Sequence, residues 1–374
     1  MMFIQMRRTV LQLRRDSSSL CEFNLLFSTS TENQQTDANT PSVSKFLVHK
    51  HHLSLQVASR VASVLKSPEK SDSVLSFWKQ SGFSNTHLEK IVKYRPRLLS
   101  ASLEKSFKPK IKIFQDLGFS ADEIAKILST DPAILHCSVD DRVIPSLAIL
   151  RGVLGSDEGV AKVLRTSGSF LAKDLEKTLI PNVKFLESCG VQMEQIIKVI
   201  YSFPRFLLHK PEIIRKSVCK ADEMGVSRSS RMFIYVVRVI SSLTNESLQL
   251  KLQAFRDMGF SEDEILKVFR MTPHAITVSE KKMKKLKEVV LSTGKYDMSS
   301  IVNNPVTLCC SIENRYIPRF RVFKILESKN LITSWPSLGT VQTLSDKKFI
   351  EKFVDPYLHE VGDVYKAKSK LDGK

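Results

Sequence analysis

Residues 118–135 read GFSADEIAKILSTDPAIL, and this stretch decides the fold. Counting from Gly118, apolar residues stand at the next position and at the sixth, ninth and tenth positions, a spacing that places them on one helix face. Ser120 and Glu123 have the spacing of a capping box, which predicts that the helix begins just after Ser120. Pro132 prevents the helix from continuing, and two more apolar residues follow it. The stretch predicts a glycine turn, a helix and a short 3₁₀ turn.

The same pattern recurs along the chain at intervals of about 35 residues, as repeat proteins require. Clean copies also begin at Gly82, Gly190 and Gly259. Weaker copies begin at Gly155, where Gly168 replaces the proline, at Gly225, which has no proline, and at Gly294, with Asn330 marking a partial eighth copy. A second proline follows in three copies, at Pro109, Pro145 and Pro318, and it suits the first turn of the next helix.

No alternating run of β-branched residues competes with the helical pattern, so we expect an all-α fold. A lone helix pair cannot bury its apolar face, and the repeats must therefore stack. The expected fold is an α-solenoid of about seven to eight helix-turn-helix repeats of about 35 residues with short 3₁₀ turns, in residues 45–335. Residues 336–374 are expected to be a C-terminal capping segment and tail. Aromatic residues of the pattern, such as Phe203 and Phe269, are expected in the core.

The chain has a large positive charge that lies within the predicted repeats. It holds 57 Lys and Arg residues against 39 Asp and Glu, a formal net charge of +18. Residues 1–40 carry four of each sign, so the whole excess falls in residues 41–374. A polyanionic partner explains this surface, and nucleic acid fits better than an anionic membrane. A basic surface kept for solubility is the alternative, and no apolar run is long enough to span a bilayer.

Residues 1–44 have a different composition from the rest of the chain. No acidic residue precedes Asp16, serines are frequent, and two arginine pairs lie seven residues apart: Arg7 with Arg8, and Arg14 with Arg15. These features are typical of an organellar transit peptide followed by a linker. We expect import into the mitochondrion, with the chloroplast as the alternative.

Basic residues recur around the prolines, which places them on one edge of the predicted stack. A line of cations at the pitch of the repeat can follow a phosphate backbone, because phosphate contacts need only charge and spacing. Each could instead be a solvated charge at a helix end, and those beside Pro318 are expected to point outward. The candidate nucleic-acid-binding residues are Arg97, Lys108, Lys110, Arg142, Arg205, Arg270, Lys281, Lys284, Lys285, Arg315, Arg319 and Arg321.

The sequence offers no recognisable catalytic motif. It contains no P-loop, no dinucleotide-binding fingerprint, no zinc-protease helix and no nucleophile elbow. Asp122 and Glu123 stand in the first turn of a predicted helix, where negative charge favours the helix dipole. The six cysteines have no zinc-ligand spacing. We therefore expect no enzymatic activity, no metal and no cofactor.

At these repeats the sequence resembles the mitochondrial transcription termination factor (mTERF) family, in particular its plant branch. The resemblance rests on the P-x-x-L turns, on Pro181-Asn182-Val183 ahead of Gly190, and on the block SIENRYIPR at 311–319. It covers about residues 46 to 365 and implies a helical repeat fold with a basic groove for duplex nucleic acid. It also implies regulation of mitochondrial or plastid transcription, including termination. The implied partners are double-stranded DNA and/or RNA, with organellar transcription or splicing proteins as further candidates, and we expect a monomer.

Two other functions remain open at the level of the sequence. The first is an RNA-binding factor in organellar intron splicing or RNA processing; single-strand readers of the pentatricopeptide type share a period near 35 residues, but they carry a code at fixed positions that is not seen here. The second is a protein-interaction helical scaffold, since solenoid faces commonly bind proteins. A scaffold has no need of the +18 charge.

Overall fold

The computed structural model describes residues 43–65 and 68–369, and the predicted transit peptide therefore lies outside the described residues except for its last two positions. All regular structure in the described residues is helical, which confirms the all-α prediction. The described residues form one compact unit. No helix in the described ranges is both long and apolar enough to cross a membrane.

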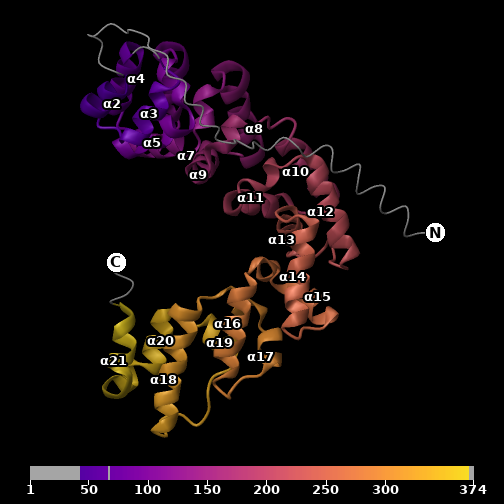
Figure 1. The fold of residues 1–374 in the computed structure, drawn as a ribbon. Helices are drawn as coiled ribbons and strands as arrows, with labels where there is room; N and C mark the ends of the chain where they lie inside the picture. The colour runs from indigo at the N-terminus through magenta and orange to yellow at the C-terminus, as the bar shows by residue number, and fades with distance from the viewer. Residues whose placement is uncertain (1–42, 66–67, 370–374) are drawn as a thin grey trace, which may run out of the picture. The chain divides into compact units, whose positions relative to one another are not determined.

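The helices alternate along the chain as the first and second members of successive pairs (Figure 1). The first helices are α2 (Val43–His51), α4 (Pro68–Gln80), α6 (Lys108–Asp116), α8 (Ile144–Leu154), α10 (Leu179–Ser188), α12 (Pro211–Glu223), α14 (Asn245–Asp257), α16 (Glu280–Leu291) and α18 (Ile317–Ser328). The second helices are α3 (Leu55–Ala62), α5 (Asn85–Tyr94), α7 (Ala121–Thr130), α9 (Asp157–Thr166), α11 (Met193–Ser202), α13 (Phe233–Ser241), α15 (Glu262–Met271), α17 (Met298–Val302) and α19 (Leu338–Thr343). Two further helices, α20 (Asp346–Phe353) and α21 (Leu358–Ser369), complete the described chain.

The turn between the two helices of each pair has the left-handed backbone that the repeat glycines predict. All seven repeat glycines have positive φ, between 64° and 95°, and Asn330 takes their place in the eighth copy with φ 58°. Asparagine tolerates this region better than most residues, because its short side chain bonds locally. His52, with φ 56°, makes the same turn between α2 and α3. The array thus begins one pair earlier than the glycine pattern indicates.

The second helix of most pairs ends in a short 3₁₀ turn, as the prolines predict. These turns are η1 (Pro96–Ser100), η3 (Pro132–His136), η5 (Gly168–Ala172), η6 (Phe206–Leu208), η7 (Pro273–Thr277) and η8 (Pro305–Cys309). Gly168 starts η5 in place of a proline because there is no room for a side chain: an added Cβ would lie 2.7 Å from Cδ1 of Ile134. The copy without a proline has no such turn, and α13 leads within three residues to α14, which Thr244 caps.

One local feature escaped the sequence pattern. A single turn of π-helix precedes three of the first helices, as η2 (Leu103–Phe107), η4 (Val139–Val143) and η9 (Ile312–Tyr316). A serine side chain caps each turn, and the second proline of the pattern follows within the first two residues of α6, α8 and α18. The prolines thus occupy the first helical turn as expected, where a missing N–H is harmless.

The core is continuous along the array. In the four clean copies, every apolar position of the pattern is buried, including both residues after the proline. Each second helix from α3 to α15 contacts the next second helix along the chain. Neighbouring 3₁₀ turns, such as η3 and η5, also contact one another. At the C-terminal end, α21 packs against α18 (Figure 1), and Phe323 of α18 packs edge-on against Phe353, with ring centroids 5.0 Å apart. This stacking is that of the predicted α-solenoid.

Candidate nucleic-acid interface

The chain path places most of the predicted cations at the same end of each repeat. A second helix runs from the glycine turn to the 3₁₀ turn, and the next first helix begins beside that turn. We call the 3₁₀ turns, the helix ends before them and the helix starts after them the proline edge. Arg97 lies in η1, Arg205 lies just before η6, Arg270 lies in the last turn of α15, and Lys281 lies in the first turn of α16.

Two of the predicted residues are buried, and the expectation that they face a phosphate backbone is wrong. Lys110 is 1% exposed and Arg319 is 0% exposed. Lys110 lies on the inner face of α6 and donates a 2.8 Å hydrogen bond from Nζ to the carbonyl oxygen of Leu135, the fourth residue of η3. Burial lowers the pKa of this amine, because the charged form is desolvated.

Arg319 makes the denser set of contacts. Its guanidinium donates to the carbonyl oxygens of Val341 (2.6 Å) and Leu344 (2.8 Å) and to Oδ1 of Asp346 (2.6 Å). It also lies over the ring of Phe349, 4.6 Å from the centroid. Arg319 thus joins α18 to α19 and α20, and its position beside Pro318 at the helix start does not make it point outward.

The same arrangement recurs in other repeats. The residues that end a 3₁₀ turn have carbonyl groups with no partner in the turn, and these need donors when they are buried. A side chain of the first helix of the same repeat supplies the donor: Asn182 bonds Leu207 (2.9 Å) and His209 (2.8 Å), Lys251 bonds Val278 (2.6 Å), and Lys282 bonds Cys309 (3.0 Å). Arg315, which lies in η9 just before α18, donates to the carbonyl oxygens of Gln342 and Leu344 at the end of α19. Part of the recurring charge is therefore structural.

Four predicted residues lie at the surface in ion pairs. They are Lys108 with Glu104, Arg142 with Asp174 (3.5 Å), Lys284 with Glu280 (2.5 Å) and Lys285 with Glu313 (2.5 Å). Pairs at this degree of exposure contribute about 0–1 kcal/mol to stability, so a phosphate group can replace the carboxylate at little cost. The Glu280 hydrogen bond raises the pKa of Lys284, which keeps this amine charged.

The remaining predicted residues are exposed and free of close ion pairs. Within the described part of the chain, Arg97, Arg270, Lys281 and Arg321 have no carboxylate partner. Arg205 is 72% exposed, and its Nη2 lies 3.7 Å from Oδ1 of Asp131. Three of the four unpaired residues lie on the proline edge. Arg321 is the exception, because it lies further along α18, away from η8.

A basic cleft lies where α16 begins. It has a volume of about 590 Å³ and is lined by Lys281, Lys282 and Lys285 together with Ser279, Ser311 and Glu313. Ser279 caps α16 by accepting a hydrogen bond from the N–H of Lys282 at 3.3 Å. A helix start and three amines together favour an oxyanion such as phosphate.

A second hollow, of about 370 Å³, lies at the C-terminal ends of α9, α11 and α13. We call it the arginine pocket, because Arg205 and Arg238 line it beside Phe203 and His209. The Arg238 guanidinium lies 4.1 Å from the ring centroid of Phe203, and burial lowers its pKa. Phe203 was expected in the core, but it is only half-buried. Phe269 is fully buried, as expected.

Arg238 was not among the predicted residues, although one sign of it is present in the sequence. It is the only charged residue in α13, whose sequence is FIYVVRVIS. A single cation in an otherwise apolar helix must either find a partner or face a pocket. The arrangement at the proline edge as a whole can hold a row of phosphate groups by charge, and the half-exposed Phe203 adds one aromatic surface.

Comparison with known proteins supports the resemblance seen in the repeats. No curated protein matches the chain. The mTERF family model matches residues 75–228 and again residues 142–350, and the two matches overlap and together cover most of the repeat array. The repeat glycines from Gly82 to Gly294 and the 3₁₀ turns from η1 to η8 lie within these matches, and the chain belongs to the mTERF family.

Proposed function

We propose that this protein binds double-stranded DNA along the proline edge and regulates transcription in an organelle, including its termination. The mTERF family is one of organellar nucleic-acid-binding proteins that act in transcription. The observation that carries the proposal is the group of unpaired cations on one edge of a chain whose net charge is +18. Duplex DNA presents its phosphates at regular spacing, and a repeated row of cations matches it without reading sequence.

The proposed contacts are the members of the predicted set that lie at the surface of the proline edge. They are Arg97, Lys108, Arg142, Arg205, Arg270, Lys281, Lys284 and Lys285, with Arg238 added from the arginine pocket. The proposed compartment is the mitochondrion of a plant, with residues 1–44 as the targeting segment and the chloroplast as the second possibility. A monomer suffices, because the row of cations belongs to one chain.

RNA binding in organellar splicing or processing is the second candidate. The half-exposed ring of Phe203, with Arg238 on one face, favours it, because single strands bind by stacking bases on aromatic and guanidinium planes. A duplex keeps its bases stacked and gains nothing from such a surface.

Binding measured against salt concentration tests the proposal. Labelled duplex DNA, duplex RNA and single-stranded RNA of equal length are titrated with the full chain, and log K is plotted against log salt. For about six phosphate contacts the slope for duplex DNA is expected to be about −5. The second candidate is supported if the chain binds single-stranded RNA more tightly than duplex DNA. In that case Phe203→Ala weakens RNA binding and leaves duplex DNA binding unchanged. An affinity insensitive to salt would contradict nucleic-acid binding altogether.

Import is tested separately. Residues 1–44 fused to a fluorescent protein are expected to direct it to mitochondria in plant cells, and the same fusion with the four arginines of residues 1–15 changed to Ala is the matched control. Fluorescence that stays in the cytosol with the unchanged segment contradicts the proposed compartment, and fluorescence in plastids selects the alternative.

A further inference from the structure

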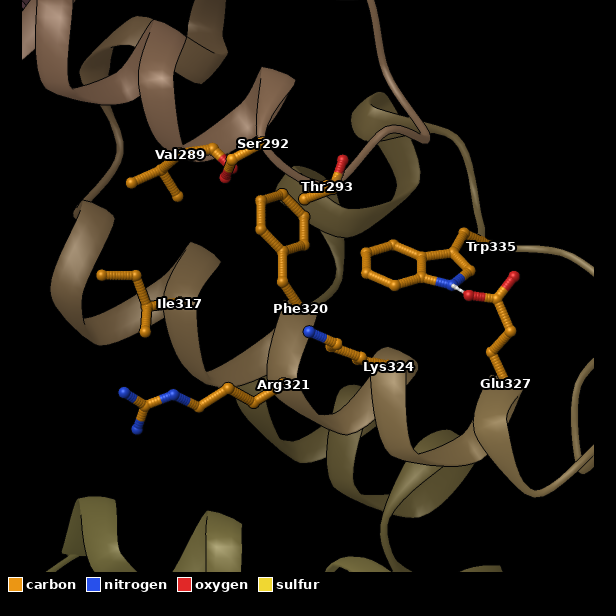
Figure 2. A pocket seen from close by; sticks show the side chains of 9 residues that line it. All are labelled: Val289, Ser292, Thr293, Ile317, Phe320, Arg321, Lys324, Glu327 and Trp335. Carbon is orange, nitrogen blue, oxygen red and sulfur yellow. Dashed lines mark hydrogen bonds between the residues drawn. The ribbon is translucent and has the colours of Figure 1, made fainter.

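A third hollow, which the nucleic-acid proposal does not use, lies between α16 and α18. It has a volume of about 350 Å³, and Val289, Ile317, Phe320 and Trp335 form its apolar surface. Figure 2 shows the Phe320 ring near the middle, Trp335 on one side of it, and the charged ends of Arg321 and Lys324 below it. Its lining has no residue in common with the basic cleft or the arginine pocket. We call it the α16–α18 groove.

Most polar atoms of this groove already have partners within the protein. The indole N–H of Trp335 donates to Oε2 of Glu327 at 3.0 Å, and Glu327 also pairs with Lys295 at 2.5 Å. The hydroxyls of Ser292 and Thr293, which directly follow α16, donate to carbonyl oxygens in its last turn, at 3.1 Å and 2.7 Å. The groove therefore has few free donors that could read the edge of a nucleobase.

The two exceptions are cations. Arg321 and Lys324 are exposed, and neither has an ion pair with any residue in the described ranges. They lie three residues apart on α18, so they are neighbours on one helix face. Two unpaired positive charges thus border an apolar hollow, and a ligand that fits must combine an apolar group with nearby negative charge.

We propose that the α16–α18 groove binds a short acidic segment of a partner protein. One large apolar side chain of the segment packs against Phe320 and Trp335, and neighbouring carboxylates pair with Arg321 and Lys324. Charge complementarity favours an acidic partner over a second copy of this basic chain. The scarcity of free donors favours a peptide over a nucleotide, whose base would need polar partners. This site is independent of the proposed DNA-binding edge.

Selection from a displayed library of random twelve-residue peptides on the full chain tests the proposal. The enriched peptides are expected to carry Asp or Glu beside an aromatic or large aliphatic residue. Synthesised peptides are then titrated against the fluorescence of Trp335. The chain has two tryptophans, and Trp78 is only 1% exposed, so a signal that is absent in Trp335→Phe belongs to Trp335.

Matched variants separate this groove from the DNA-binding edge. The pair Arg321→Glu and Lys324→Glu is expected to weaken peptide binding at least about tenfold. Lys281→Glu with Lys284→Glu makes the same change of charge on α16 and is expected to leave peptide binding within about twofold, while it weakens DNA binding. Arg321→Gln with Lys324→Gln serves as the milder version, and circular dichroism checks that each variant is folded.

Three results would overturn the proposal. If the enriched peptides lack acidic residues, or bind the Arg321→Glu, Lys324→Glu variant as tightly as the parent, the two cations have no role in binding. If no peptide is enriched on the parent relative to this variant, the groove is not a peptide-binding site. Duplex DNA or a nucleoside monophosphate that changes Trp335 fluorescence and competes with the peptides would make nucleic acid the occupant.

Discussion

Arg97 and Arg319 each follow a proline of the repeat pattern, yet the two residues have opposite surroundings. Arg97 stands in a 3₁₀ turn, where it is exposed and has no ion pair among the described residues. Arg319 stands in the first turn of α18, where it is fully buried and bonds two carbonyls and a carboxylate. The position of a cation in the repeat therefore places it at the proline edge. The direction of its side chain then determines whether it stabilises the fold from inside or is exposed and available to bind a ligand.

Arg319→Met is expected to have the largest effect on stability. It takes the donor away from the buried carbonyl of Val341, leaves the carbonyl of Leu344 with only the 3.4 Å bond from Arg315, and removes one partner of Asp346. Loss of one partner from a buried charged network costs about 3 kcal/mol of unfolding free energy. Urea denaturation followed by circular dichroism measures it. The control is Arg321→Met on the same helix, which is expected to change stability by less than about 0.5 kcal/mol. If both substitutions lower the unfolding free energy equally, the buried and the exposed arginine do not differ in their contribution to stability.

Lys110→Met is expected to have a smaller effect of the same kind. Methionine preserves the apolar stem, but the carbonyl of Leu135 loses the amine that lies 2.8 Å from it and keeps only the hydroxyl of Ser106, at 3.0 Å. Loss of one hydrogen bond from an acceptor that keeps a second donor costs about 1 kcal/mol. The midpoint of urea unfolding gives the change, with the exposed neighbour Lys108→Met as control. A variant at 110 that is as stable as the parent would show that the hydrogen bond contributes nothing net.

Replacing three exposed cations together tests the other half of the comparison. Arg97→Gln, Arg270→Gln and Lys281→Gln are expected to leave stability within about 0.5 kcal/mol each, since none of them has an ion pair in the described chain. Duplex DNA binding should weaken, and the slope of log K against log salt should flatten by up to about 2.7. Fluorescence anisotropy measures both. Binding equal to that of the parent would move the interface away from the proline edge.

Acidification is expected to cause a modest loss of stability. Burial lowers the pKa of His136, His209 and His274 below the ordinary value of 6.5, so the fold favours their neutral forms. The stabilising contribution is complete above pH 6.5 and is lost as pH falls through the lowered pKa values. Thermal unfolding between pH 8 and 5 measures it, and His209→Gln should reduce the slope. Stability that increases as the pH falls from 8 to 5 would contradict the lowered pKa values of these histidines.

The repeat frame could be predicted from the sequence almost completely, because each mark in it has one dominant physical cause. Glycine occurs at the turn because the backbone there has positive φ, and proline occurs where the helix ends because it cannot continue one. The apolar triplet has the spacing of one buried helix face. The α2–α3 pair lies in the predicted array of residues 45–335, but the glycine pattern does not mark it, because His52 makes its turn without a glycine. The π-helical turns were missed because nothing in the apolar spacing distinguishes them from the start of an α-helix.

The candidate site was less predictable, because charge alone does not report which way a side chain points. The sequence did hold a usable sign, at the position eight or nine residues before the repeat glycine. That position holds Lys110, Ser146, Asn182, Ser217 and Lys251, polar residues in a buried stripe, and all but Lys251 are nearly fully buried. A polar residue that recurs on an inner face indicates a structural hydrogen bond rather than a ligand contact.

The hydrogen bonds from Lys110, Asn182 and Lys251 each close within one repeat, from its first helix to the end of its own 3₁₀ turn. Neighbouring repeats meet largely through apolar side chains, which slide and repack without a directional requirement. A small change of angle between two repeats therefore leaves these buried bonds intact. We expect the joints between repeats to be the compliant parts of the array, so that an array bound to duplex DNA as proposed above follows a bend at the cost of a little side-chain repacking.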